Sequence, residues 1–311
     1  MGYAINLLEL SGLNMLLALS VYATLKVGQF SLAQVGFWAI GAYVTGMLTG
    51  LLGWGLWPAL LVCALLCAAI GLLLGYPCLR VRGIYLTLAT VAFLELVRVF
   101  FHNLEYTQLR GGTPIGPAGA VGFRGIPLMT TWFEILLAVV GTAALFAWIE
   151  RSRLGLSLHA VREDETAAAC TGIRVVRLKV GMFGLGAAIA AIGGGLHATY
   201  TTFVNSDNFN FHLALISIFF VTVGGTQRYY GPMLGALLLT VLPEVLRPVG
   251  DFRMVVYGGV VLIIMIAVPR GIADELMQRW ASLRTRAAPA PTAPGFVPVK
   301  TSSPDDRVTQ G

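Results

Sequence analysis

Charged side chains are scarce in this chain of 311 residues, of which 12% are Asp, Glu, Lys or Arg and 57% are hydrophobic. Soluble proteins carry about 25% charged residues, so this chain lacks the polar surface that a globular fold in water requires. Its apolar runs are continuous rather than alternating, which favours helices over a membrane barrel. With a mean hydropathy of +0.78, the composition predicts an all-α polytopic membrane protein with about eight to ten transmembrane helices.

Sequence motifs of several enzyme classes are also missing. No Gly-x-x-x-x-Gly-Lys-Ser/Thr sequence occurs, so the chain has no P-loop for ATP. Neither His-Glu-x-x-His nor Gly-x-Ser-x-Gly is present, and the four histidines are scattered. The four cysteines lack Cys-x-x-Cys spacing and lie mostly in apolar stretches, which is typical of small buried residues rather than of a disulfide framework. We therefore expect no enzymatic activity, no metal site and no cofactor.

Apolar segments long enough to cross a bilayer recur along most of the sequence. A hydrocarbon core of about 30 Å requires roughly 20 residues of helix. The candidate spans are residues 3–25, 33–51, 56–76, 84–101, 132–149, 180–200, 213–225, 231–247 and 252–269. The segment 213–225 is short for a full span, so we expect it to be tilted, broken or re-entrant.

Lysine and arginine residues concentrate in alternate loops. They occur at Lys26, Arg80, Arg82, throughout 151–179, at Arg228, and from Arg270 onward, whereas the loops near 52–55 and 201–212 contain none. Arg110, Arg124, Arg247 and Arg253 depart from this pattern. The positive-inside rule then predicts nine spans with an outside N-terminus and a cytoplasmic C-terminus. The net charge of +6 is thus a topology signal and does not indicate nucleic-acid binding.

The chain divides into a transmembrane domain over residues 1–272 and a tail over 273–311. Within the first part, residues 102–131 include the sequence RGGTPIGPAGAVGFRGIP, and glycine and proline at this density exclude regular helix. We expect this segment to be an external loop. The tail is rich in proline, alanine and serine, a composition that predicts a cytoplasmic and largely disordered segment.

Four ionisable residues fall within the predicted spans: Glu9, Glu95, Arg98 and Glu244. Such groups are costly inside a membrane and indicate function by default. Glu95 and Arg98 are three residues apart, so they lie on one helix face and are interpreted as an ion pair. Glu9 and Glu244 lie near span ends, where they reach interface water. No series of carboxylates indicates a proton relay.

Small residues recur at short intervals in several spans, where they allow helix backbones to approach closely. These residues are Gly36, Gly41, Gly46, Gly186, Ala190, Gly194, Gly231 and Gly235. Close packing is the simpler interpretation, and a translocation path lined by small residues is the alternative.

The long polar interval between two spans, residues 150–179, contains six basic and four acidic side chains. Strong helix formers occupy 163–169, and Gly172 stands where a helix can end. We expect a short helix that lies along the membrane surface on the cytoplasmic side. A solvated loop that only enforces topology is the alternative, but the length and helical propensity of the interval exceed what a topology signal needs.

Several stretches of the sequence together resemble one protein family. They are GQFSLAQVGFWAIGAYVTGML (28–48), LRVRGIYLTLATVAFLEL (79–96), GIP (125–127), SRLGLSLHAVREDETAAACTGI (152–173), VGGTQRYYGPMLGALLLTVLPEVLR (223–247) and VPRGI (268–272). In this order, they resemble the permease subunits of branched-chain amino-acid ABC importers, in which two non-identical permeases pair. The resemblance implies a permease domain with two pseudo-symmetric halves.

The resemblance also implies which residues couple transport to ATP hydrolysis. Family members carry a Glu-Ala-Ala-x-x-x-Gly motif in a cytoplasmic loop that inserts into a groove of the ATPase. Here Ala167, Ala168 and Gly172 keep the spacing, while the acidic residue is one position early, at Glu165. The residues expected to flank the ATPase contact are Arg162, Glu163 and Asp164. Residues expected near the translocation path are Gly28, Gln29, Ser31 and Glu95.

The partners implied by the resemblance are a second homologous permease, two cytoplasmic ATP-binding subunits and an extracytoplasmic substrate-binding protein, all at a bacterial inner membrane. A self-contained secondary transporter is one alternative, but it needs an ion or proton site at mid-membrane. A passive channel for a small solute such as urea or an amino acid is another. The glycine-rich spans suit a channel, yet the polar interval would then have no use. The sequence therefore favours an importer permease without its own ATPase site.

Overall fold

A computed structural model describes residues 2–78, 83–110, 113–268, 271–273 and 275. Residues up to Glu275 form one compact unit, and nearly all of the predicted tail over 273–311 lies outside the described residues. The basic residues Arg80, Arg82 and Arg270, which entered the topology argument, also lie outside them. The description below therefore concerns the first unit alone.

In the described part of the chain, nine helices coincide with the nine predicted spans to within a few residues at most ends. These helices are α1 (Gly2–Leu25), α2 (Ala33–Gly50), α3 (Leu56–Cys78), α4 (Ile84–His102), α5 (Trp132–Arg151), α8 (Val175–Thr201), α9 (Phe211–Gly224), α10 (Tyr230–Val245) and α11 (Arg253–Ala267). Five of them, α1, α3, α4, α5 and α8, are long and apolar enough to cross a membrane. The predicted helical, multi-pass membrane fold is confirmed.

The helix α9 is short, as the sequence predicted for 213–225. It has 14 residues, which corresponds to about 21 Å at the usual rise, less than a bilayer core. It packs against α10, and glycine makes this possible: a Cβ at Gly235 would lie 2.0 Å from the carbonyl oxygen of Phe220. The five residues 225–229 join the two short helices. Because tilting would shorten its reach further, α9 by itself is too short to cross a bilayer core of about 30 Å.

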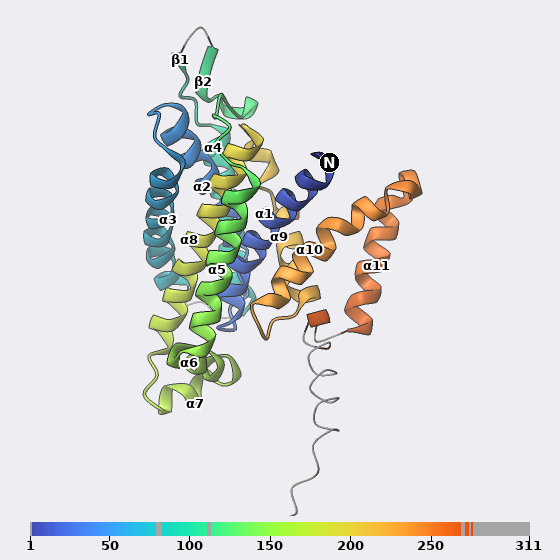
Figure 1. The fold of residues 1–311 in the computed structure, drawn as a ribbon. Helices are drawn as coiled ribbons and strands as arrows, with labels where there is room; N and C mark the ends of the chain where they lie inside the picture. Colours follow the sequence, from blue (N-terminus) through green and yellow to red (C-terminus); the bar gives the residue numbers. More distant parts are fainter. Residues whose placement is uncertain (1, 79–82, 111–112, 269–270, 274, 276–311) are drawn as a thin grey trace, which may run out of the picture. The chain divides into compact units, whose positions relative to one another are not determined.

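The centre of the bundle is formed by α8, which packs against α1, α2 and α3 (Figure 1). Small residues set the spacing of these helices. A Cβ added at Gly41 would lie 2.3 Å from the carbonyl oxygen of Ala191, and one at Gly194 would lie 2.0 Å from that of Trp38. The rows of small residues are thus sites of close helix packing, which confirms the simpler of the two interpretations.

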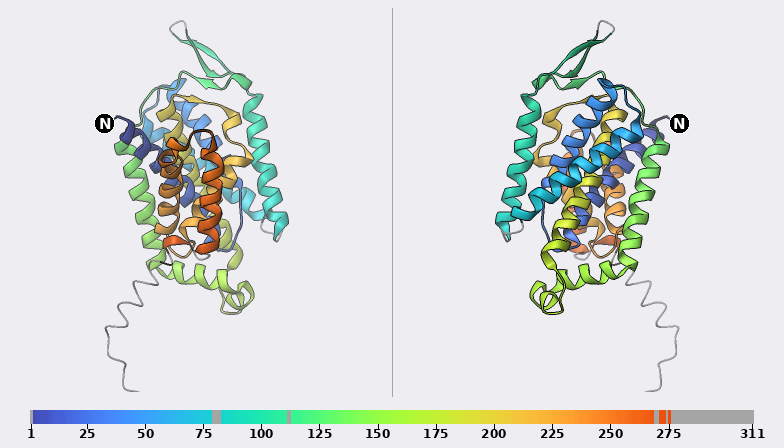
Figure 2. Two further views of the ribbon diagram at one scale, coloured as in Figure 1. Left: turned by 90° about the vertical axis from the view of Figure 1, so that its right-hand side faces the viewer. Right: turned by 90° about the vertical axis from the view of Figure 1, so that its left-hand side faces the viewer.

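The outer helices present large apolar side chains away from the protein. Leu73 on α3, Leu96 on α4, Trp148 on α5 and Ile266 on α11 are each at least 64% exposed. A soluble protein does not expose apolar surface on this scale, whereas lipid tails cover it without cost. These four helices lie on the outside of the bundle in both views of Figure 2.

The segment 102–131 contains strands, which the all-α expectation did not include. Four antiparallel strands form a sheet in the order β1 (Gln108–Arg110), β2 (Thr113–Pro117), β3 (Phe123–Arg124) and β4 (Phe203–Val204), with a 3₁₀ turn η1 (Gly119–Val121) between β2 and β3. The described residues of 103–131 contain no α-helix, as predicted, although the loop begins one residue later than expected because His102 ends α4. Gly122, at a φ of 87°, allows the tight turn before β3, because side chains rarely adopt that conformation. The strands β1 and β2 lie at the end of the bundle opposite to α6 and α7 (Figure 1).

Candidate functional site

The polar interval after α5 folds into two short helices rather than one. Ser152 caps α6 (Arg153–Glu163) by accepting a hydrogen bond from the Leu154 amide at 3.2 Å. Asp164 then caps α7 (Glu165–Cys170), accepting from the Thr166 and Ala167 amides at 2.7 and 3.1 Å. The expectation of one helix through 163–169 was wrong, because a carboxylate one residue before a helix satisfies its unpaired amides better as a cap than inside it.

The end of α7 agrees with the sequence-based prediction. Gly172 has a φ of 85°, the left-handed conformation that commonly terminates a helix and that glycine adopts without strain. The central helix α8 begins three residues later, at Val175, so the last part of the predicted loop 151–179 is already helical. Lys179 on α8 forms an ion pair with Glu165 on α7, which ties the coupling segment to the bundle.

The predicted coupling residues divide into two groups by exposure. Glu163, Asp164, Glu165 and Ala167 are exposed, as a docking surface requires. Ala168 is only 3% exposed and packs inside this chain, so its side chain is not presented to a partner. The amides of Ala167 and then Thr166 hold the pKa of the Asp164 carboxyl below its ordinary value, because they stabilise the charged form. The role of these residues in coupling stays a prediction.

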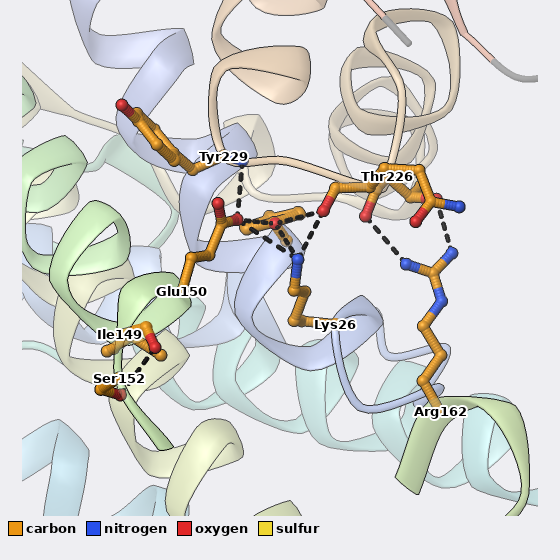
Figure 3. A network of polar contacts seen from close by, with 9 residues as sticks. Lys26, Ile149, Glu150, Ser152, Arg162, Thr226 and Tyr229 are labelled. Atoms are coloured by element: carbon orange, nitrogen blue, oxygen red, sulfur yellow. Dashed lines mark hydrogen bonds and ion pairs between the residues drawn. The ribbon is translucent and has the colours of Figure 1, made fainter. Parts of the chain in front are cut away.

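Arg162, the first of the predicted coupling residues along the chain, points back toward the bundle. Its guanidinium donates to the Thr226 carbonyl at 2.9 Å and to the Thr226 hydroxyl at 2.7 Å (Figure 3). Thr226 belongs to the 225–229 loop between α9 and α10. Two parallel hydrogen bonds from one guanidinium fix both position and orientation. The segment α6 is therefore coupled mechanically to the short helix pair.

A second contact to the same loop comes from the ends of α1 and α5. Lys26, just after α1, forms an ion pair with Glu150, in the last turn of α5, at 3.2 Å, and also donates to the Gln227 carbonyl. The same Glu150 oxygen accepts from the Tyr22 hydroxyl at 2.6 Å and from the Tyr229 amide at 3.1 Å. Figure 3 shows these groups converging beside the Arg162–Thr226 contact.

We call this set of residues, Tyr22, Lys26, Glu150, Arg162, Thr226, Gln227 and Tyr229, the loop clamp. The Lys26 and Glu150 side chains are only 11% and 15% exposed. Burial lowers the pKa of the Lys26 ammonium, and the neighbouring Glu150 carboxylate opposes that shift. A cavity of about 560 Å³ beside the clamp is lined by Lys26, Glu150, Arg151, His159 and Arg228, among others.

The predicted translocation residues do not come together. Gly28 and Gln29 line a cavity of about 470 Å³ beside Glu165 and Lys179, so they lie at the end of the bundle that carries α7. The Gln29 amide is buried without a hydrogen-bond partner, and Ser31, two residues further along the chain, is also buried. Glu95 lies elsewhere on α4.

The environment of Glu95 is an ion-pair cluster. Arg98 approaches Glu95 at 2.8 Å, as the spacing of three residues predicted, and also contacts Asp207 at 3.2 Å. Asp207 belongs to the 3₁₀ turn η2 (Ser206–Asn208), which follows β4 near the sheet. The predicted ion pair between Glu95 and Arg98 is thus confirmed. The additional contact from Arg98 to Asp207 fastens α4 to the segment before α9. This arrangement indicates a structural role for Glu95.

Sequence reasoning missed the loop clamp. Lys26 was treated only as a topology marker, and Glu150 only as part of a charged interval. The signal available in the sequence was that both residues stand at the boundary of an apolar span, where a charge is costly unless it finds a partner. Nothing in the sequence pairs residues 124 positions apart.

Comparisons with known proteins show the family to which the sequence belongs. The family described as "Branched-chain amino acid transport system / permease component" matches residues 3–269. The high-affinity branched-chain amino acid transport system permease protein LivM of Escherichia coli (strain K12) is 31% identical over 288 residues, which cover 84% of this chain and 66% of that protein. LivM of Salmonella typhimurium is 32% identical with the same coverage.

The alignment with a more distant relative extends over most of both proteins. The probable branched-chain amino acid transport permease protein LivH of Methanocaldococcus jannaschii is 27% identical over 281 residues, which cover 84% of this chain and 85% of that protein. The chain spans 66% of the length of the two LivM proteins, just under two thirds. No solved structure matches the chain.

Proposed function

Because this chain belongs to the permease family of branched-chain amino-acid transport systems, we propose that it is a membrane-spanning subunit of an ABC importer for these amino acids. In this proposal a second homologous permease completes the translocation path, two cytoplasmic subunits hydrolyse ATP, and an extracytoplasmic protein delivers the substrate. The N-terminus faces outward and α6 and α7 face the cytoplasm. The relatives named for branched-chain amino acids support the substrate class.

The observation that carries the proposal is the link between α6 and the loop that follows α9. The residues at the α6–α7 junction, Glu163, Asp164 and Glu165, are exposed and available to a partner. One residue earlier, Arg162 holds Thr226 through two hydrogen bonds. A partner that moves the junction therefore pulls directly on the α9–α10 pair. A chain without an ATP site needs such a contact to use ATP hydrolysed elsewhere.

The experiment is to place a bulky charge on the exposed face of α7. Ala167→Arg adds a long cation beside the acidic junction without touching the buried Ala168. In the assembled importer we expect it to weaken docking of the ATP-binding subunits roughly ten- to hundredfold, because overpacked contacts cost about 1–3 kcal/mol. Co-purification of these subunits and substrate-stimulated ATP hydrolysis measure the effect.

The matched control is the same substitution at Ala120, which is exposed in η1 near the sheet. Ala120→Arg should leave the co-purification of the ATP-binding subunits at the wild-type level, because it lies at the opposite end of the bundle from α7 (Figure 1). Full retention of ATPase binding by Ala167→Arg would contradict the assignment of α7 as the docking surface.

Purified alone in liposomes with ATP, the chain should move no solute against a gradient. Uphill uptake by this polypeptide alone would favour a secondary transporter instead.

A further inference from the structure

A separate cavity lies in the half of the bundle that is remote from α6 and α7. It has a volume of about 380 Å³, is open on one side, and is lined by α1, α2, α8, residues 208–210 and the start of α9. Apolar side chains, including Leu17, Leu213 and Ile216, form part of its wall, and Asn14, Trp38 and His197 contribute polar groups. Its size is that of a pocket for a small organic molecule. None of the predicted translocation residues lines it.

Polar side chains form part of the cavity wall, and the imidazole of His197 is one of them. Its Nδ1 atom is buried and has no hydrogen-bond partner within the described residues, so the rest of the ring is what lines the cavity. Its ring lies 6.1 Å from the Trp38 ring, centroid to centroid. The Asn14 amide, which also lines the cavity, donates a hydrogen bond of 2.9 Å to the Thr240 hydroxyl. These groups can bind the polar end of a small molecule.

The Trp38 side of the cavity is rigid because Trp38 packs directly against two glycines of α8. A Cβ at Gly193 would lie 2.3 Å from the indole ring, and one at Gly194 would lie 2.0 Å from the Trp38 carbonyl oxygen. The indole therefore lies directly on the backbone of α8 and has no room to shift toward it. A pre-formed wall of this kind favours binding, since little entropy is lost when the ligand enters.

The lining contains no aspartate, glutamate, lysine or arginine. A ligand with a net charge would remain uncompensated there, which is costly in a buried site. A zwitterion has no net charge. Each of its two charged ends still needs hydrogen-bond partners, and amide and imidazole groups can supply these to both ends. The leucine and isoleucine side chains accommodate an aliphatic group, whose removal from water is favourable.

We propose that this cavity is a station on the translocation path that receives a neutral amino acid with an aliphatic side chain. Trp38 and His197 position the ligand, and Leu213 and Ile216 contact its side chain. The inference rests on the proposed function, since it assigns the substrate of that importer to a place in this chain. It also moves the path from Gly28 and Gln29 to the space between α1, α2, α8 and α9.

The test uses the complete importer in liposomes, with leucine uptake driven by ATP. Ile216→Trp fills the cavity, and we expect the uptake rate to fall roughly ten- to hundredfold, with the ATP-binding subunits still bound. The control is Leu137→Trp, the same enlargement on the lipid-facing side of α5, where the side chain is 47% exposed. The control should transport at the wild-type rate.

Two further variants separate ligand binding from packing. His197→Ala should raise the leucine concentration needed for half-maximal uptake, whereas His197→Asn, which keeps a hydrogen-bonding group, should restore it in part. If Ile216→Trp does not assemble, Ile216→Cys in a background without the native cysteines replaces it. A water-soluble thiol reagent should then block uptake, and leucine should slow the labelling.

The outcomes of the two proposals are distinguishable. If the wild-type importer takes up no neutral amino acid, the proposed function fails and the inference fails with it. If the wild type transports leucine but Ile216→Trp and His197→Ala behave like Leu137→Trp, the cavity is not on the path. Resistance of Ile216→Cys to the reagent would likewise overturn the inference, because it would mean that lipid or the second permease fills the cavity.

Discussion

Removal of the Glu150 carboxylate should destabilise the protein severely, because one oxygen of this residue serves three donors. Lys26 lies at 3.2 Å, the Tyr22 hydroxyl at 2.6 Å and the Tyr229 amide at 3.1 Å. In Glu150→Ala the Lys26 ammonium remains charged at 11% exposure without its counter-ion. Loss of one partner of a buried pair costs about 3–5 kcal/mol.

Since both side chains retain slight exposure, we expect the low end of that range, about 3 kcal/mol. This corresponds to a roughly hundredfold change in the unfolding equilibrium. Glu150→Gln keeps an acceptor but removes the charge, so it should cost less, about 1–2 kcal/mol. The double variant Lys26→Met, Glu150→Leu leaves no buried charge and should recover most of the loss, as replacement of buried ion pairs by apolar residues often does.

The assay is the free energy of unfolding in mixed micelles, measured by titration with a denaturing detergent and followed by helical circular dichroism. The single variants Lys26→Met and Glu150→Leu, with the wild type and the double variant, complete a double-variant cycle. Two results would refute the reasoning: a Glu150→Ala variant within about 0.5 kcal/mol of the wild type, or a double variant less stable than Glu150→Ala. Either would mean that water reaches the ion pair and that the loop clamp is not buried.

Two other predictions follow from the packing and the orientation of the bundle. Gly194→Ala should lower the free energy of unfolding by about 1–3 kcal/mol, because the new Cβ would lie 2.0 Å from the Trp38 carbonyl oxygen. Gly181→Ala on the same helix has open space around the new Cβ, so its stability should be unchanged or rise by up to about 1 kcal/mol. Equal stabilities of the two variants in the same detergent titration would contradict the close packing at Gly194. Native Cys170 is exposed on α7 and, with the other three cysteines replaced, should react with an impermeant thiol reagent only from the cytoplasm, whereas Ala120→Cys in a chain without native cysteines should react only from outside. Labelling of both from one side would show that the predicted topology is wrong.

Local features of the fold could be predicted because their causes are local. The nine apolar segments follow from run length and composition, and the short segment at 213–225 did become the short helix α9. The pairing of Glu95 with Arg98 follows from a spacing of three residues on one helix. The positive φ at Gly172 follows from glycine after a helix-forming run. Each of these needs no information beyond a few neighbouring residues.

The candidate site was predicted only in part, and the misses share a cause. The position of the polar interval was clear from its composition, but the break at Asp164 depended on competition between capping and helix continuation. The burial of Ala168 depended on which face of α7 meets the bundle. Periodicity over six residues does not fix that face, so an exposed and a buried alanine look alike in the sequence.

The sequence by itself determined that this protein spans a membrane with many helices, that no P-loop motif occurs in it and that a long polar interval interrupts its apolar spans. Only the tertiary structure decided that Lys26 meets Glu150 and that Arg162 holds Thr226, across 124 and 64 positions respectively. It also decided that β3 pairs with β4 and that Trp38 and His197 line one cavity. Hydrophobic runs specify which segments enter the membrane, since burial depends on composition. Which helices then become neighbours depends on side-chain shape and on glycine positions in both partners, and this information is spread over the whole chain.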